Sequence, residues 1–426
     1  MAPSPRTILV AAALAGMLLV TPLTKGWISE GVEHDRGNRA RWISVVRIEC
    51  LIALCNVFIY AQMMEFFERD KKIYVDTSAR SRASQLLLLI FAGSHACYLM
   101  FYFPAWCQAL FFEISNILSG VWTNLLGFTA GFCLVNWGVW IMEQWLPTRR
   151  FLQWLTRPRI LHALAFDRKV QIKATVVIVA VLSAAMWYSS DKIVIRHVTL
   201  PVRGLTTPDK APLRLALLSD LHIGGSVYKE QVARVADEVM QLSVDAVLIV
   251  GDMVDGEVAS IADRLEPLWH VAAMTKTYFW LALYKRKGIH VLRNNYTMLK
   301  GVCLAGVDDI SSGKSGVPTH RMNISLAVSD CPITANRVLL SHNPASVREI
   351  GAEELRGIDV ILSGHTHAGQ FYVVAPVVYW MLPYFYGEYD ISDHGHLFVT
   401  AGTLYQGPPL KNLAMSQIWV VTLVPE

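Results

Sequence analysis

Long apolar runs before about residue 190 are the feature that most constrains how this 426-residue chain can fold. Because a bilayer core about 30 Å thick requires roughly 20 apolar residues per helix, they predict a membrane-embedded first half with five spans. The stretch between residues 109 and 142 is too short for two spans and a turn, so it is predicted to be one long, tilted helix. The predicted spans are Ile8 to Leu23, Ile43 to Met64, Gln85 to Trp106, Ile114 to Ile141 and Ala174 to Ser189.

Composition supports a membrane protein and excludes some partners. The charged fraction of 17% is below the roughly 25% of soluble domains, and 53% of residues are apolar. A net charge of +4 without a long basic run gives no reason to expect nucleic-acid binding, and no protein partner is predicted. Cleavage of the first span as a signal peptide stays an alternative, although the cleavage pattern after it is poor.

Lysine and arginine in the short loops predict the orientation in the membrane. They gather at residues 69–82 and 149–169, whereas the loop between the third and fourth spans has none. Both basic loops are therefore predicted to be cytoplasmic, although the basic first loop disagrees weakly. The C-terminal half is then lumenal or extracellular, where the sequons at Asn295 and Asn323 can be glycosylated. Cys303 and Cys331 can be bridged only in such an oxidising compartment.

His95 is the main ionisable residue deep within a predicted span. An intramembrane ionisable group is by default a functional candidate, but a packed histidine is the commoner case. The spans show no repeat, broken-helix pair or charged row, so a channel or transporter is not favoured. The membrane half is predicted to be an anchor.

After Lys192 the pattern changes to short β-rich runs that alternate with amphipathic stretches. Strands are predicted at 213–219, 245–250, 337–340 and 359–362, and a helix at 227–242 with valines on one face. This alternation predicts an α/β domain. The expected organisation is a multi-span anchor at 1–191, a linker at 192–212 and an α/β domain at 213–426.

Ligand-type side chains follow all four predicted strands of this domain. Because ligands gather at the carboxyl ends of strands in α/β sheets, we expect these side chains to lie together. Asp255 is assigned to supporting contacts only, and Asp308 and Asp309 to a turn. The predicted metal ligands are Asp220 and His222, Asp252 after Gly251, His342, and His365 and His367.

Oxygen and nitrogen ligands of this kind suit two divalent ions of Mn, Fe, Zn or Co. Asp220, His222 and His367 are expected at the first ion and His342 with His365 at the second, while Asp252 bridges the two. Two ions about 3.5–4 Å apart clamp the attacking and leaving oxygens and lower the pKa of a bridging water. The predicted reaction is hydrolysis of a phosphoester through a metal-bridging hydroxide.

These motifs resemble the calcineurin-like metallophosphoesterase family from about Arg214 to the C-terminus. Asp-x-His, Gly-Asp-x-x-Asp and Gly-His-x-His occur in the order of that family, and the companions at 306–309, 341–344 and 363–370 look like its membrane-associated branch. The resemblance implies a four-layer α/β/β/α sandwich as the fold of the domain. It also implies that Gly402 to Pro409 borders the active site.

One motif of the family is missing. The resemblance implies Gly-Asn-His followed by Glu or Asp near Thr277 to Leu281, whose Asn binds the second ion and whose His acts on the leaving group. Residues 281–287 read Leu-Ala-Leu-Tyr-Lys-Arg-Lys, with neither Asn nor His. Asn294, His270 and His290 are poor substitutes, so no catalytic acid is assigned. The alternative hypothesis is therefore a catalytically inactive membrane protein with a binding or regulatory role.

Overall fold

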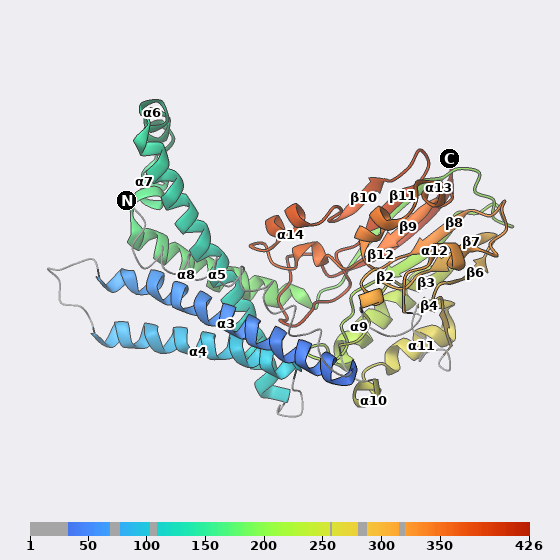
Figure 1. Cartoon of the computed structure of the whole chain (residues 1–426), viewed down its shortest axis with the longest axis horizontal. Coiled ribbons are helices and arrows are strands. Elements are labelled where there is room, and N and C mark those ends of the chain that lie inside the picture. The colour runs from blue at the N-terminus through green and yellow to red at the C-terminus, as the bar shows by residue number, and fades with distance from the viewer. Residues whose placement is uncertain (1–32, 69–76, 103–108, 256–257, 280–287, 315–319) are drawn as a thin grey trace. The chain divides into compact units, whose positions relative to one another are not determined.

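The computed structural model describes residues 33–68, 77–102, 109–255, 258–279, 288–314 and 320–426 (Figure 1). The chain forms two compact units, Met1–Ala184 and Ala185–Glu426. Each unit has its own apolar core. Within 192–212, which was expected to be a linker, residues 194–202 form a strand of the second unit. This difference arises because the strand finds its partner at the far end of the chain, where a local pattern gives no sign of it.

Long apolar helices build the first unit. Among the described residues, four helices have the length and composition of membrane spans: Val45–Phe67, Thr77–Met100, Leu110–Gln144 and Arg168–Ser190. They correspond to four of the five predicted spans, whereas the predicted span Ile8 to Leu23 lies outside the described residues. The stretch from 109 to 142 is one helix, as expected. The helices are α3 (Glu33–Glu68), α4 (Thr77–Tyr102), α5 (Ala109–Gln144), α6 (Leu146–Leu155), α7 (Arg159–Phe166) and α8 (Arg168–Ser190).

Polar side chains meet inside this helical unit between α3, α4 and α5. His95 of α4 forms an ion pair with Glu49 of α3, and its Nε2 lies 3.0 Å from Nδ2 of Asn56. Trp122 of α5 donates its indole N–H to Oδ1 of Asn56 over 2.6 Å. Polar groups in a bilayer need such partners because water is absent there. The contacts of His95 are thus those of a residue that joins helices.

The first sheet of the second unit has six strands in the order β1-β12-β2-β3-β4-β5. β2 to β5 run parallel, and β12 lies antiparallel to β2 and parallel to β1. Helix α9 buries Val232, Val235 and Val239, the valine face predicted from the sequence. The strands are β1 (Val194–Val202), β2 (Leu213–Leu218), β3 (Ala246–Ile249), β4 (Thr277–Phe279), β5 (Ile289–Val291) and β12 (Gln417–Pro425), and the helices are α9 (Lys229–Met240), α10 (Val258–Ile261) and α11 (Glu266–Met274).

The second sheet also has six strands, in the order β10-β11-β9-β8-β7-β6. Its four inner strands run parallel, and β6 and β10 are antiparallel edges. Cys303 and Cys331 form a disulfide in this half. The elements are β6 (Asn295–Leu299), β7 (Val302–Gly306), η3 (Ser312–Lys314), α12 (Ile324–Val328), β8 (Arg337–Leu340), η4 (Pro344–Glu349), α13 (Ala352–Arg356), β9 (Val360–Ser363), η5 (His367–Gly369), α14 (Ala375–Met381), β10 (Gly387–Asp390) and β11 (His396–Val399).

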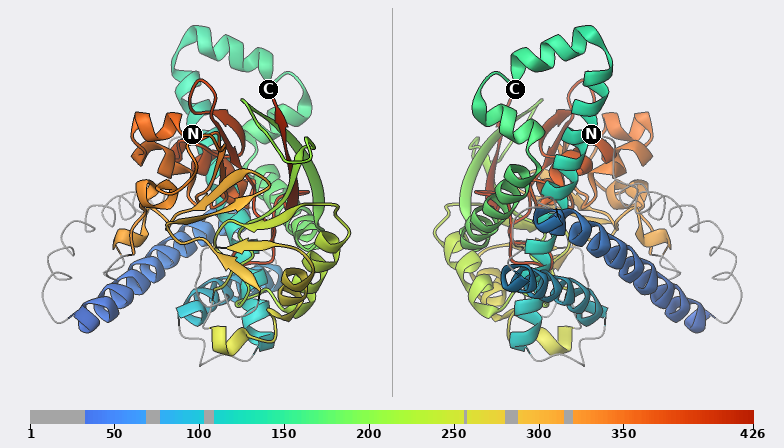
Figure 2. Two further views of the ribbon diagram at one scale, coloured as in Figure 1. Left: turned by 90° about the vertical axis from the view of Figure 1, so that its right-hand side faces the viewer. Right: turned by 90° about the vertical axis from the view of Figure 1, so that its left-hand side faces the viewer.

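Alternate side chains of each strand pack in different cores, as the two-residue period of a strand requires. Leu215 and Leu217 of β2 pack with Val360 and Leu362 of β9 between the sheets. Leu218 of β2 faces the core of α9 and α11, and strands of the second sheet share another core with α12. In Figure 2 the yellow-green and the orange helices lie on opposite sides of the strands. All four predicted strands are thereby buried on both faces.

Candidate metal centre

The carboxyl ends of four strands bring the predicted ligands together. In the first sheet, Asp220 follows β2 and Asp252 follows β3. In the second sheet, His342 follows β8 and His365 follows β9. The backbone N–H of His365 donates to both carboxylate oxygens of Asp220 at 3.1 Å, which ties the two sheets together at this edge. The convergence expected of parallel strand ends is therefore present.

Six side chains form two groups that we call the inner and the outer trio. Within each trio, one ligand atom from each residue lies within 4.8 Å of the others. All residues of the inner trio are buried, whereas the outer trio includes a half-buried aspartate and an exposed histidine. The inner trio is Asp220, His222 and His367, and the outer trio is Asp252, His342 and His365.

Distances within the inner trio are those expected of ligands that share one cation. Nε2 of His367 lies 3.3 Å from Oδ1 of Asp220 and 3.1 Å from Nε2 of His222. Two ligands bound at about 2.0–2.1 Å to one tetrahedral zinc lie roughly 3.3–3.4 Å apart. The three side chains therefore fit an ion of this size with little rearrangement.

In the outer trio, a buried lone pair faces carboxylates. His342 donates its Nδ1–H to the carbonyl of Val250 over 2.7 Å, so Nε2 of the neutral ring is an acceptor. That Nε2 has no hydrogen-bond partner, yet it lies 3.3 Å from Oδ2 of Asp252 and 3.9 Å from Oδ1 of Asp220. Such a contact needs a proton or a cation between the atoms. Oδ2 of Asp252 also lies 3.6 Å from Nε2 of His222, so Asp252 stands between the trios.

The pKa values show that the carboxylates favour a positive charge at His342 but not at His367. Burial lowers the pKa of His342, but the carboxylates of Asp252 and Asp220 outweigh it and raise the pKa to about 9. At His367 the effect of burial exceeds that of the Asp220 carboxylate, and the pKa is lowered to about 3. For Asp220, burial raises the pKa, but the surrounding histidines outweigh burial and lower it. The negative charge of the carboxylates, which favours a proton on His342, would also favour a metal cation beside it.

Two glycines permit the close approach of the strand ends. A Cβ at Gly364 would lie 2.4 Å from Oδ2 of Asp220 and 1.7 Å from Oγ of Ser219. Gly251 has a φ of +97°, and a Cβ there would lie 2.3 Å from Nδ1 of His342. Any other residue at either position would displace a predicted ligand. Glycine is therefore required at these two positions, because a larger residue would collide with the candidate ligands.

Backbone strain is concentrated at the same residues. A non-glycine residue with a positive φ is uncommon, and clusters of them occur where a functional geometry is imposed. Five of the six trio residues have this conformation, while His342 does not. The φ angles are 53° for Asp220, 45° for His222, 41° for Asp252, 73° for His365 and 49° for His367.

Asp255 orients a histidine of the inner trio. Its Oδ1 accepts a hydrogen bond from Nδ1–H of His222 at 2.7 Å, which leaves Nε2 of that ring directed at His367. Burial lowers the pKa of His222, but Asp255 outweighs burial and raises it. A carboxylate behind a ligating histidine is a common supporting contact in metal sites. The supporting role predicted for Asp255 agrees with this geometry.

The loop at 402–409 packs against the strand that carries Asp220. Leu404 donates its backbone N–H to the carbonyl of Asp220 over 3.3 Å, and Thr403 donates to that of Ser219 over 2.7 Å. Lys411 is fully buried, and its ammonium donates to the carbonyls of Gly402, at 2.9 Å, and of Leu404. Burial lowers the pKa of Lys411 to about 7. The sequence interpretation missed Lys411, although a lone lysine among apolar residues was the available signal.

Asn294, His270 and His290, the residues considered as substitutes for the missing motif, do not belong to the metal centre. Asn294 uses its side chain locally, where Nδ2 donates to the carbonyl of Arg321 at 2.8 Å and Oδ1 accepts from the backbone of Asn323 at 3.0 Å. His290 is exposed and its ring lies 5.2 Å from that of Tyr278, while His270 is exposed on α11. None of these residues belongs to either trio.

The missing third motif falls on residues 280–287, which lie outside the described residues. The strands on either side are described, and β4 pairs with β5 in parallel. Parallel neighbours usually need a crossover of a dozen or more residues. Here residues 280–288, nine in number, separate Phe279 from Ile289. The connection is therefore shorter than a helical crossover requires, as the sequence indicated.

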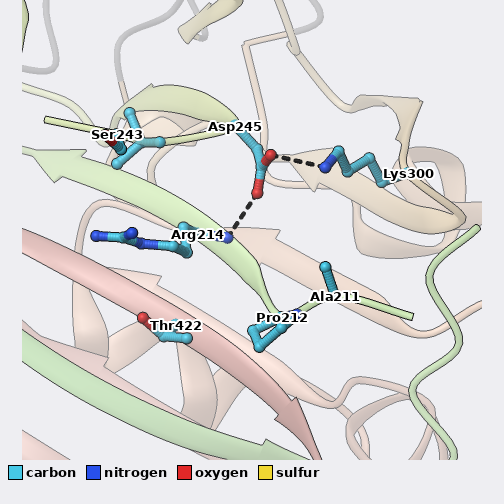
Figure 3. A pocket seen from close by; sticks show the side chains of 8 residues that line it. Ala211, Pro212, Arg214, Ser243, Asp245, Lys300 and Thr422 are labelled. Carbon is cyan, nitrogen blue, oxygen red and sulfur yellow. Dashed lines mark hydrogen bonds and ion pairs between the residues drawn. The ribbon is translucent and has the colours of Figure 1, made fainter. Parts of the chain in front are cut away.

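A separate pocket of about 540 Å³ lies at the opposite ends of β2 and β3 (Figure 3). Lys300 forms an ion pair of 2.8 Å with Asp245 there and another of 3.1 Å with Asp209. The backbone N–H of Arg214 donates to Asp245 over 2.8 Å. Asp245 is thus already engaged, and the pocket offers no ligand cluster like that of the trios.

Comparison with known proteins places this geometry in context. No family model matches the sequence. The chain is 28% identical over 433 residues to a transmembrane protein with metallophosphoesterase domain from Danio rerio, covering 94% of both chains. It is 25% identical over 434 residues to the protein of the same name from Bos taurus, again covering 94% of each. An uncharacterized metallophosphoesterase of Helicobacter pylori is 31% identical over 227 residues, which are 50% of this chain and 60% of that protein.

Proposed function

We propose that the chain is a membrane-anchored, divalent-metal-dependent phosphoester hydrolase of the calcineurin-like metallophosphoesterase family. The activity is assigned to the second unit, Ala185–Glu426, in which the predicted ligands lie within 213–426. Its layered cores, with helices outside two packed sheets, support the four-layer α/β/β/α sandwich as its fold. The single observation that carries the proposal is the pairing of the inner and outer trios around Asp252.

Each residue of the centre has a role in this proposal. The inner trio would hold one ion and the outer trio the other, and Asp252 stands between the two trios. When bound, a pair of divalent ions supplies Lewis acidity and an activated water. His365 is exposed, so the outer trio is the part of the centre open to solvent and substrate. Mn, Fe, Zn and Co all suit this mixed set of donors.

The test uses the purified full-length chain. We expect it to retain two divalent ions by elemental analysis and to hydrolyse p-nitrophenyl phosphate or bis(p-nitrophenyl) phosphate. Asp252→Asn should lose both properties, whereas Asp390→Asn, at an exposed carboxylate on β10, should keep them. Wild-type protein that neither binds metal nor turns over either ester contradicts the proposal.

The alternative function is a catalytically inactive binding protein, favoured by the sequence of 281–287 and the short β4–β5 connection. In that case the wild-type chain binds metal without turnover. Insertion of a Gly-Asn-His loop before Gly288 should then restore turnover, since a catalytic acid contributes about 10²–10⁴ in rate. An insertion that folds and binds metal without any gain argues against simple loss of the motif.

We also propose that the second unit is lumenal or extracellular. The Cys303–Cys331 disulfide requires an oxidising compartment, and the sequon residues Asn295 and Asn323 are both exposed. Glycosidase treatment of protein from animal cells should reduce its apparent mass. Asn295→Gln with Asn323→Gln should abolish the shift. A cytoplasmic location, shown by digestion of the second unit when protease is added outside sealed microsomes, would contradict the assignment.

A further inference from the structure

A run without any charged side chain follows the Gly-His-x-His motif. It extends from Phe371 to Tyr386 and contains tyrosine, tryptophan and phenylalanine among aliphatic residues. Its helix, α14, has no buried residue, and Trp380 is 85% exposed. Soluble proteins rarely expose contiguous apolar side chains of this size without a partner. The α14 surface comprises Tyr372, Val377, Tyr379, Trp380, Met381 and Leu413.

Contacts within the second unit connect the α14 surface to the end of α8, the last candidate span. Ser189 in the last turn of α8 donates its hydroxyl to the carbonyl of Lys411 at 3.4 Å. Ser416 donates its hydroxyl to the carbonyl of Ser190 at 2.6 Å. Between these positions, the backbone N–H of Leu413 donates to the hydroxyl of Tyr372 at 3.0 Å. The loop that holds the end of the span thus also forms one edge of the α14 surface.

A short connection joins the last candidate span to the first strand of the second unit. α8 ends at Ser190 and β1 begins at Val194, so residues 191–193 alone separate them. Trp187 and Tyr188 in the last turn of α8 are exposed, as is usual for anchors at the bilayer interface. Tryptophan and tyrosine on the α14 surface suit the same interface, because their rings are apolar and their N–H and O–H groups are polar.

The α14 surface also adjoins the candidate metal centre. Thr366, between His365 and His367, donates its hydroxyl to the carbonyl of Phe385 just beyond α14, at 2.7 Å. A Cβ at Gly369 would lie 2.4 Å from Cα of Ala375, the first residue of α14. Figure 1 shows α14 on the side of the unit away from β6 and β7. The segment that carries the α14 surface therefore contacts the segment that carries His365 and His367.

We propose that the α14 surface docks on the membrane that α8 spans and presents phosphoester head groups of lipids to the metal centre. This inference rests on the proposed function for the choice of substrate, but the docking surface itself does not. The absence of charge favours a bilayer over a charged protein or nucleic acid as the partner. Insertion of exposed aromatic side chains is favourable in proportion to the apolar area removed from water.

The first experiment tests docking without reference to catalysis. The full-length chain is reconstituted in lipid nanodiscs, with Trp380→p-benzoylphenylalanine as a photo-cross-linker. Ile333→p-benzoylphenylalanine is the matched control, because Ile333 is 93% exposed. It lies in the loop before the amino end of β8, whereas α14 follows the carboxyl end of β9. Lipid adducts at position 380 and not at 333 are expected in mass spectra. No adduct at 380, equal adducts at both, or adducts to protein alone would overturn the proposal.

The second experiment tests the substrate class. Nanodiscs contain phosphatidic acid or phosphatidylglycerol, and p-nitrophenyl phosphate is the soluble reference. Trp380→Ala with Met381→Ala should reduce lipid turnover about tenfold or more, given the apolar area lost, and leave p-nitrophenyl phosphate turnover unchanged. Ile333→Ala should affect neither.

Equal turnover of the lipids by the double variant and wild type would overturn lipid presentation by α14. Wild type that hydrolyses p-nitrophenyl phosphate but neither lipid would also overturn it. If wild type hydrolyses no ester at all, the proposed function fails instead. The adducts at position 380 then still support or overturn the docking surface.

Discussion

The inner and outer trios contain the same chemical groups but differ in their support. Asp220, His222 and His367 are buried, and Asp255 and the loop at 402–404 hold two of them in place. In the outer trio, His365 is exposed and Asp252 is half-buried. The family resemblance implies that a Gly-Asn-His motif, absent from 281–287, would supply a further ligand beside the outer trio. The comparison indicates that neighbouring groups hold the inner trio, whereas the outer trio is more open.

The largest effect is expected from Asp220→Ala. This carboxylate contacts histidines of both trios and accepts from the backbone of His365, so its loss should disturb both ions. We expect metal content to fall at both sites and any esterase turnover to drop by more than about 100-fold. Elemental analysis and steady-state kinetics provide the measurement. A variant that still holds its full metal content would contradict the shared role of Asp220.

A smaller and selective effect is expected from Asp255→Asn. The amide cannot orient His222 as a carboxylate does, so the affinity of the inner site should fall about 10–100-fold. The outer site should bind as before. Calorimetric titration with Zn²⁺ or Mn²⁺ separates the two steps. An equal loss at both sites would show that the trios are not independently supported.

Proton competition should make the metal affinity of the outer trio increase by up to about tenfold for each pH unit. His342 has a pKa of about 9, above the ordinary 6.5, so its proton stabilises the metal-free fold below pH 6.5 and this contribution is lost as pH rises through 9. Metal affinity at the outer site should therefore increase between pH 7 and 9. At the inner site His367, with its pKa of about 3, is already neutral, so proton competition there involves His222, whose pKa is also raised. Titrations at three pH values check this, and an outer-site affinity that does not change with pH would be evidence against it.

The smallest effect is expected from Lys411→Met, which removes the ammonium from the carbonyls of Gly402 and Leu404. Buried acceptors without a donor cost about 1–3 kcal/mol in the free energy of unfolding. The inner site should weaken slightly because the same loop bonds to Asp220, while the outer site should not. Lys411→Arg is the control that keeps the charge. Denaturant unfolding of the detergent-solubilised chain measures the change, and an unaltered midpoint would exclude this role.

Much of the fold was readable from the sequence because its signals are local. Apolar runs predicted the four described candidate spans, and the buried strands 213–219 and 359–362 were recognised from short apolar stretches. The strand at 194–202 was expected to be linker, because its exposed polar residues mask its alternation and its partner β12 lies more than 200 residues away. Non-local pairing of this kind leaves little trace in a single sequence.

The candidate site shows the same difference between local features, which the sequence reveals, and non-local contacts, which it does not. Residue types and motif order were enough to propose six ligands, since carboxylates and imidazoles at strand ends have few other uses in combination. The spacing of those ligands, the orientation of His222 by Asp255 and the buried Lys411 became visible only in three dimensions. Asp255 and Lys411 are not sequence neighbours of the groups that they contact, so no local pattern could reveal these contacts.

The amino-acid sequence alone determined that this chain has apolar segments long enough to span a membrane and carries a set of candidate metal ligands, because hydropathy and donor chemistry belong to the residues themselves. Tertiary structure alone decided that these ligands divide into a buried and an open trio, and that an aromatic helix stands beside them at the end of the last candidate span. Burial and proximity depend on which distant segments pack together, and packing is a property of the whole fold.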